Sequence, residues 1–147
     1  MQQRSRKVRF FTLIEVVVVI VILVMLASLA APMYFRYIRQ AKVSTAKTQI
    51  KLLEQALTDY RLDIGSYPDA ADGLKALEEN VQQDDKWDGP YIKPAVPKDP
   101  WGNEYVYNNP GENERPYDII CYGADGQPGG EGENADITSY DGSEDKK

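Results

Sequence analysis

The sequence feature that most constrains this chain is an almost unbroken apolar run that follows Phe11 and ends at Ala31. It covers roughly nineteen residues, and a helix of that length nearly matches the ~30 Å hydrocarbon core of a bilayer. The run is longer than the apolar core of an ordinary secretory signal peptide. We therefore predict a transmembrane and assembly helix over residues 11–32.

A single carboxylate, that of Glu15, lies inside this apolar run. An ionised acid deep in a bilayer costs on the order of 2.5–3.5 kcal/mol, so such residues usually have a partner. Two interpretations are open from the span alone. Either Glu15 has a charged partner within the apolar region, or it lies shallow, near the headgroups, at little cost.

Charge is distributed unevenly along the 147 residues, whose net charge is −6. The basic leader, residues 1–10, contains four cations and no acid, whereas residues 121–147 contain seven acids and two cations. Because cationic flanks favour the cytoplasmic side, we expect the leader in the cytoplasm and the acidic part across the membrane. The exported part has no basic patch of the kind that nucleic-acid binding requires.

The chain contains one cysteine, Cys121, and no histidine. A lone cysteine cannot form an intramolecular disulfide, and its apolar neighbours indicate a buried, inert thiol. Without histidine the chain lacks the commonest general base and every Ser-His-Asp or Cys-His nucleophile pair. The sequence offers no convergent carboxylate pair, so we predict no enzyme activity and name no catalytic residue.

A helical pattern continues beyond the apolar run. The predicted amphipathic half covers residues 33–64, and from Val43 to Ile64 apolar residues recur every three or four positions, which places them on one helical face. Pro32 should kink the helix because it removes a backbone hydrogen bond, and Gly65 followed by a proline ends it. We predict one long helix from Thr12 to Leu62, half transmembrane and half amphipathic.

Residues 65–142 are expected to form a small domain that packs on the amphipathic half of the long helix and gives an α+β fold. A short second helix, capped by an aspartate, is predicted over Asp69–Asn80. The segments 104–107 and 117–122 predict an antiparallel hairpin with a longish loop. Residues 143–147 have the composition of a flexible tail.

These features together resemble a known family. A basic leader, the sequence Phe11-Thr12-Leu13-Ile14-Glu15, an apolar helix and a following proline resemble the type IV pilin and pseudopilin superfamily. The remaining chain resembles one branch, the major pseudopilins of type II secretion systems, whose Asp-Pro-Trp-Gly and Gly-Ala-Asp-Gly blocks are specific. The matching segments are Ala56–Tyr60, Gly65–Pro68, Gly73–Leu77, Gly89–Tyr91, Pro97–Asn103 and Tyr122–Ile137.

The resemblance implies a pilin-like fold and a structural role as the major subunit of a periplasmic pseudopilus, which polymerises to drive export of folded proteins across the outer membrane. It implies a single-pass inner-membrane protein with a periplasmic C-terminal domain. The implied partners are membrane lipid, copies of the same chain in a homopolymer, minor pseudopilins, an inner-membrane assembly platform and the prepilin peptidase.

Within such a polymer Glu15 and Pro32 would be assembly residues, and Glu15 would neutralise the terminal amine of its own or an adjacent subunit. Two other functions are alternatives. One is a type IV major pilin for adhesion or motility, although those pilins usually have a C-terminal disulfide. The other is a membrane-anchored calcium-binding domain that does not polymerise.

The glycine-rich segment after Tyr122 concentrates oxygen donors, which suit calcium rather than zinc. On composition alone, a solvated acidic loop and a metal site are equally consistent with it. The resemblance implies a C-terminal calcium loop, in which one ligand position is unassigned and Asn134, Glu131 or water could fill it. The implied ligands are Tyr122 through its carbonyl, Asp125, Glu133 through its carbonyl or side chain, Asn134 and Asp136.

Six side chains in the middle of the chain have two interpretations each. The loop aromatics either anchor the loop to the core or line a subunit contact. The helix lysines form either a solvated face or ion pairs with acids of a neighbouring subunit. These residues are Trp87, Tyr91 and Trp101, and Lys42, Lys47 and Lys51.

The processing site departs from the family pattern. The resemblance implies that the prepilin peptidase cuts just before Phe11 and methylates the new amine. The family has a glycine before the cut because the enzyme needs an unhindered residue, whereas this chain has Phe10. Either the sequence is altered at this position, or the peptidase that acts on this chain tolerates a bulky residue, or the precursor is cut inefficiently. An uncut chain would lack the amine that Glu15 should meet.

We therefore predict that leader removal is impaired in the unaltered chain and improves in a Phe10→Gly variant. The measurement is the intact mass of each protein after extraction from membranes. Complete removal of residues 1–10 from the unaltered chain would contradict this prediction.

Overall fold

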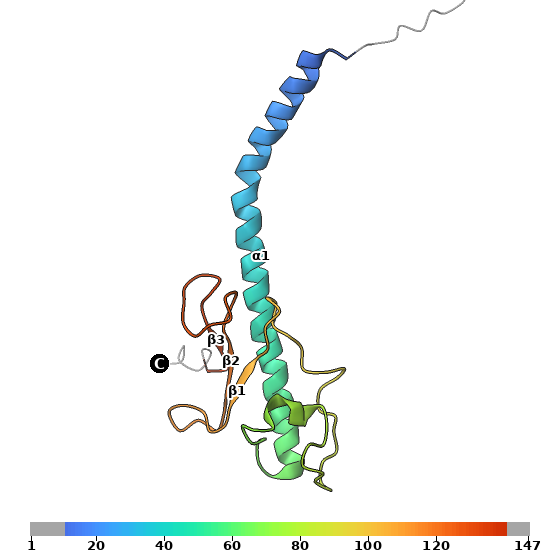
Figure 1. Ribbon diagram of the computed structural model, residues 1–147, viewed down its shortest axis with the longest axis vertical. Coiled ribbons are helices and arrows are strands. Elements are labelled where there is room, and N and C mark those ends of the chain that lie inside the picture. The colour runs from blue at the N-terminus through green and yellow to red at the C-terminus, as the bar shows by residue number, and fades with distance from the viewer. Residues whose placement is uncertain (1–10, 141–147) are drawn as a thin grey trace, which may run out of the picture. The chain divides into compact units, whose positions relative to one another are not determined.

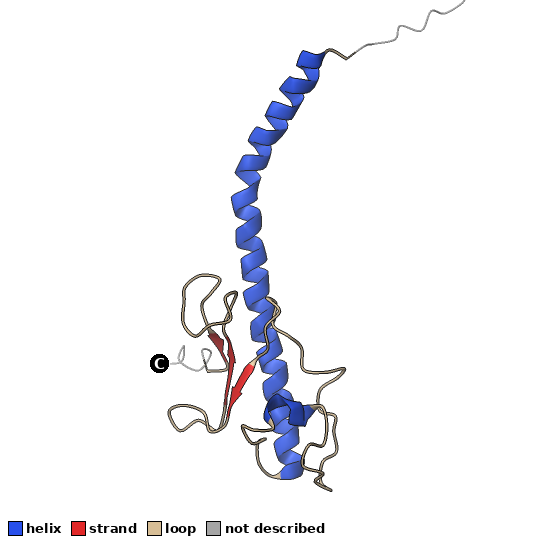
Figure 2. Cartoon of the chain, viewed as in Figure 1, coloured by secondary structure: helices blue, strands red, loops and turns tan. Residues whose placement is uncertain are grey.

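The computed structural model describes residues 11–140, so the leader with Phe10 and the predicted tail over residues 143–147 lie outside the described part. The chain divides into two compact units, one up to Ile38 and one from Arg39 onward. Figures 1 and 2 show the elements in order. They are helix α1 (Leu13–Ile64), the 3₁₀ helix η1 (Gly73–Leu77), and strands β1 (Val106–Asn108), β2 (Asp118–Cys121) and β3 (Ile137–Thr138).

Helix α1 confirms the predicted long helix to within two residues at each end. At its start the Glu15 backbone N–H donates to Thr12 Oγ1 at 3.3 Å, so Thr12 caps the helix. The Thr-x-x-Glu spacing of a capping box could have indicated this start. The helix is continuous through Pro32, and the kink at that residue stays a prediction.

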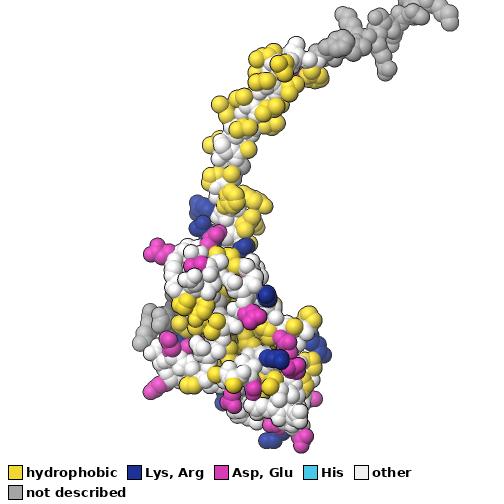
Figure 3. Space-filling model, in the orientation of Figure 1, with side chains coloured by type: hydrophobic (Ala, Val, Ile, Leu, Met, Phe, Trp, Pro, Cys, Tyr) yellow, Lys and Arg dark blue, Asp and Glu magenta, His cyan; other side chains and the backbone are white. Residues whose placement is uncertain are grey.

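The first unit exposes its apolar residues on every side of α1. All large apolar side chains from Phe11 to Leu29 are exposed. Their exposed fractions range from 44% at Val17 to 82% at Leu13. Figure 3 shows hydrophobic side chains covering this part of the helix. Among the described residues, α1 is the one helix long and apolar enough to cross a membrane, with a mean hydropathy of 3.1 over eighteen residues.

The second unit has the hydrophobic core. The predicted amphipathic face of α1 is buried in this unit, and its central residue Leu53 has no exposed surface. The sheet and η1 provide the other side of the core, because a helix with one apolar face needs a partner that covers that face. The buried helix residues are Ala46, Ile50, Leu53, Ala56, Leu57 and Tyr60, and their partners include Leu74, Leu77, Ile119, Cys121 and Ile137.

The sheet has three antiparallel strands in the order β1-β2-β3. Tyr107 pairs with Ile119 in the first ladder, which confirms the predicted hairpin. Cys121 pairs with Ile137 in the second ladder. Strand β3 was not predicted, because two residues after a glycine-rich segment are too few to show an alternating pattern.

The predicted helix over Asp69–Asn80 is wrong in length. The structure has only the five-residue η1, because Gly73 adopts a φ of +57° and a tight turn at Asp69 precedes it. The side chain of Asp72 makes no cap hydrogen bond and instead accepts one from Gln82 Nε2 at 2.6 Å.

The aromatic residues of the long loop confirm the anchoring interpretation. Trp87 Nε1 donates to the Ala76 carbonyl at 3.0 Å. The Tyr91 ring lies edge-on to both Tyr60 and Trp87, with centroids 5.5 and 5.6 Å away. Trp101 is likewise partly buried against the core. These contacts attach the loop to the core, so the loop is part of the folded domain.

Candidate functional site

The candidate metal loop connects β2 to β3, and its two ends meet. The Ala124 N–H donates to the Glu133 carbonyl at 2.9 Å. Gly123 has a φ of +65°, and a Cβ on it would lie 2.6 Å from the Glu133 carbonyl oxygen. Only glycine permits this approach, so Gly123 allows the predicted ligands on both sides of the loop to come together.

The base of this loop is held by a buried aspartate that was not predicted as part of the site. Asp99 is only 4% exposed, and its Oδ1 accepts hydrogen bonds from the backbone N–H groups of Trp101 and Asn103. The Asn103 side chain then donates to the Gly123 carbonyl at 3.0 Å. The turn-forming Asp-Pro-Trp-Gly block is the signal that could have indicated this role.

The other oxygen of Asp99 fixes the thiol at the end of β2. Cys121 has no exposed surface, and its Sγ donates to Asp99 Oδ2 at 3.1 Å. The pKa of the Cys121 thiol is raised to about 12, and burial is the main cause. The prediction of a buried, inert thiol is therefore confirmed.

Asp136, at the far end of the loop, has one satisfied and one unsatisfied oxygen. Its Oδ2 accepts a hydrogen bond from the Gly129 N–H at 2.9 Å, whereas Oδ1 is buried without a hydrogen-bond partner among residues 11–140. A buried acceptor left unpaired costs about 1–3 kcal/mol, more when it is charged. A cation bound at this oxygen would remove that cost, so the geometry at Asp136 fits a metal ligand.

Other predicted ligands are placed differently. Oε1 of the Glu133 carboxylate lies 3.3 Å from Arg39 Nε, so this side chain already has a cationic partner. Asp125 Oδ1 accepts a hydrogen bond from the Gln127 N–H. The Asn134 N–H donates to the Glu131 carbonyl.

No three acidic or cysteine side chains converge on one point within residues 11–140. Any ion held by this loop must therefore use backbone carbonyls, amides or water in addition to carboxylates. Calcium accepts such mixed oxygen ligands. The structure brings together Gly123, Ala124 and Glu133, while the complete ligand set stays a prediction.

The predicted assembly residues lie apart on the first unit. Glu15 is in the first turn of α1, and Pro32 is seventeen positions later, or about 25 Å along the helix axis. Phe11, the expected first residue after processing, is 78% exposed. Their proposed roles involve a second copy of the chain and not contacts among themselves.

Comparison with known proteins identifies the family. The family model of type II secretion system protein G matches residues 33–140. Type II secretion system core protein G of Vibrio cholerae is 44% identical over 94% of this chain and 95% of its own length. The core protein G of Pseudomonas aeruginosa is 42% identical over 96% of this chain and 99% of its own length.

A solved structure supports the same assignment. The crystal structure of the major pseudopilin from the type 2 secretion system of enterohaemorrhagic Escherichia coli has a TM-score of 0.56 and 36% identity. The match covers 69% of this chain and 88% of that one. It confirms the fold predicted above, a long helix with a small antiparallel sheet.

The fold and these matches first define a class, the pseudopilins. More narrowly, the chain belongs to the type II secretion system protein G family, the major pseudopilins. The pseudopilin prediction is thereby confirmed over the type IV pilin alternative. The family is one of structural subunits, and together with the apolar helix it fits a membrane-anchored protein.

Proposed function

We propose that this chain is the polymerising major subunit of a periplasmic pseudopilus, anchored in the inner membrane before assembly. The observation that carries the proposal is the first half of α1, whose large apolar side chains are exposed on all faces. A helix of this kind is stable only when lipid or other apolar helices surround it. In a head-to-tail polymer, identical helices replace the lipid, and a repeated heterologous contact builds a filament.

Glu15 supports this proposal because a carboxylate on such a helix needs a partner once lipid and headgroups are left behind. The partner we propose is the terminal amine that leader removal creates, on the same or a neighbouring subunit. Removing one member of a buried ion pair costs about 3–5 kcal/mol because the other charge stays unpaired. The pair would therefore favour one register of packing between copies.

The remaining partners follow from the proposed assembly. A prepilin peptidase would act on the leader, and an inner-membrane platform would add subunits to the filament. Minor pseudopilins would form part of the same filament. The exported domain is acidic, since residues 59–88 contain nine acids and three cations. This charge favours protein partners over nucleic acid.

The secretion role predicts that a strain lacking this gene loses an extracellular enzyme from its medium and regains it with the unaltered gene. Glu15→Gln, tested in a Phe10→Gly background so that the amine is present, should reduce the secreted enzyme by about tenfold or more. Glu104→Gln, which removes an exposed carboxylate of the second unit, is the matched control and should secrete normally.

Unchanged secretion after gene deletion would contradict the secretion role. Normal secretion by the Glu15→Gln variant, with membrane levels equal to those of its parent, would contradict the role of Glu15 alone. The two results are separable because deletion tests the whole chain and the substitution tests one contact.

We further propose that the loop from Tyr122 to Asp136 binds calcium. Support comes from the buried, unpaired oxygen of Asp136 and from the contact between Ala124 and the Glu133 carbonyl. Tyr122, Asp125, Asn134 and water are the proposed additional oxygen donors. Calcium would neutralise the repelling carboxylates of the loop and would stabilise the folded state by mass action.

Calcium binding predicts that chelation lowers the melting temperature of the full chain in detergent. The expected stabilisation is about 2.7 kcal/mol when free calcium is about 100 times its dissociation constant. Asp136→Asn should remove the difference between calcium and chelator, whereas Asp85→Asn, an exposed acid outside the loop, should keep it. Equal melting of the unaltered chain in calcium and chelator would contradict the proposal.

A further inference from the structure

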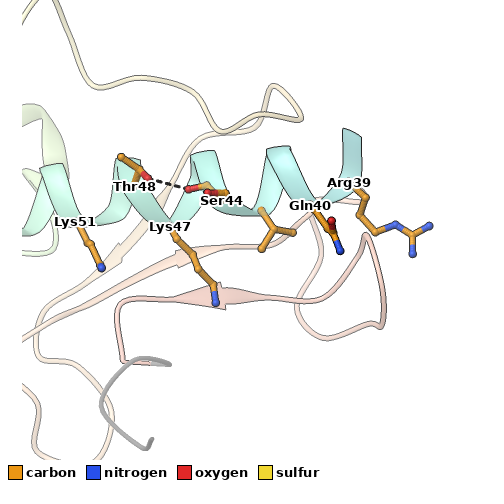
Figure 4. Close-up of a pocket in the computed structure, with 7 residues that line it drawn as sticks. Arg39, Gln40, Ser44, Lys47, Thr48 and Lys51 are labelled. Carbon is orange, nitrogen blue, oxygen red and sulfur yellow. Dashed lines mark hydrogen bonds between the residues drawn. The ribbon is translucent and has the colours of Figure 1, made fainter. Parts of the chain in front are cut away.

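One side of α1 in the second unit carries an open, cation-lined groove. Its volume is about 480 Å³. Figure 4 shows Lys47 and Lys51 projecting from the same side of the helix, one turn apart, with Arg39 farther along. The lining residues are Arg39, Gln40, Val43, Ser44, Lys47, Thr48 and Lys51.

Within the described residues, two of the three cations that line this groove have no ion-pair partner. Residues 39–51 contain four cations and no acid. Arg39 is paired with Glu133, and Lys51 lies near enough to Glu54 to act on its carboxylate, but no ion pair within residues 11–140 involves Lys47 or Lys51. Both lysines are exposed, so the groove presents positive charge to a partner.

The opposite charge gathers at the C-terminal end of the same helix. Several aspartates lie close enough to the buried ring of Tyr60 to act on its hydroxyl: Asp69, Asp72 and Asp84. The Tyr91 hydroxyl donates to Asp63 at 2.8 Å and accepts from the Asp88 N–H at 3.1 Å. We name this set, together with the exposed Asp85, the acidic end.

One copy of the chain cannot bring these two surfaces together. Lys51 and Asp63 are twelve positions apart on α1, or about 18 Å along its axis, and Lys47 is farther away. That separation exceeds the Debye length of about 8 Å at physiological ionic strength, so attraction within one copy is largely screened. Two copies displaced along the helix axis, in contrast, place opposite charges beside each other.

We propose that the acidic end of one copy docks on the Lys47–Lys51 groove of the next copy. The proposal rests on the polymer described under Proposed function, in which neighbouring copies are displaced along the axis. The groove then sets the direction and spacing of the exported domains, whereas the apolar half of α1 supplies most of the cohesion. Charge complementarity of this kind fixes register more than it adds affinity.

The first test is crosslinking between copies in cells that make the whole secretion system. A full chain with Lys47→Cys and Asp85→Cys should give a covalent dimer on oxidation, whereas each single variant should not. The native Cys121 has no exposed surface and should not react. A disulfide within one copy leaves the chain monomeric, so a covalent dimer reports contact between copies.

The second test is charge reversal. Lys47→Glu with Lys51→Glu should reduce crosslinking or filament yield about fivefold, as expected for two exposed pairs made repulsive. Asp85→Lys with Asp88→Lys should have a similar effect, and combining the four changes should restore the yield. Lys93→Glu with Lys98→Glu, an equal charge change at exposed sites outside the groove, is the matched control.

Three outcomes would overturn the proposal. One is normal secretion by the double-cysteine chain without any dimer, which would leave the proposed function intact. Another is a loss of yield that the combined reversal does not restore. The third is weaker binding of the reversed chain to vesicles of anionic lipid with crosslinking unchanged, which would make the groove a headgroup site. Unchanged secretion after deletion of the gene would instead contradict the proposed function.

Discussion

The structure depends on one constraint, the need to surround the first half of α1 with apolar material. Its large side chains from Phe11 to Leu29 are exposed on all faces of the helix. Apolar surface in water costs about 25 cal/mol per Å². The free-energy cost of exposing this stretch to water would therefore exceed the free energy of unfolding of a typical small domain. A bilayer satisfies the constraint for a single copy, and a bundle of identical helices satisfies it for many. Membrane anchoring and polymerisation are therefore two solutions to the same physical problem.

The second unit has its own hydrophobic core, and in it the helix buries only one side. The same helix changes at its C-terminal half to a one-sided pattern, with Leu53 and Leu57 fully buried. The sheet and loops cover that side, and the buried carboxylate of Asp99 links the Asp-Pro-Trp-Gly turn to β2 through Cys121. Asn103 extends this link to the base of the candidate calcium loop. Core contacts thus position the loop. Within the described residues, Oδ1 of Asp136 in this loop is buried without a hydrogen-bond partner.

The long helix and the hairpin could be predicted from the sequence because both depend on regular periodicity over many residues. The 3₁₀ helix was misjudged because the positive φ of Gly73 interrupts a pattern that otherwise resembles a helix. Strand β3 has two residues and is defined by its partner Cys121, so no local signal identifies it. For the site, composition identified the loop, but the pairing of Glu133 with Arg39 spans 94 positions and no local spacing predicts it. Contacts of that kind come from tertiary packing.

In the proposed filament, copies of this helix replace lipid on all of its faces. The direct measurement introduces a photo-crosslinking side chain, which reacts with any neighbouring group, at Val17, Val18, Val19 or Ile20. These positions are about 100° apart around the axis and together sample every face. Each full chain is produced with its secretion system and irradiated in the cell envelope. Crosslinks between copies are expected at all four positions. Crosslinks at one face only, or at none while secretion proceeds, would contradict the replacement of lipid by copies.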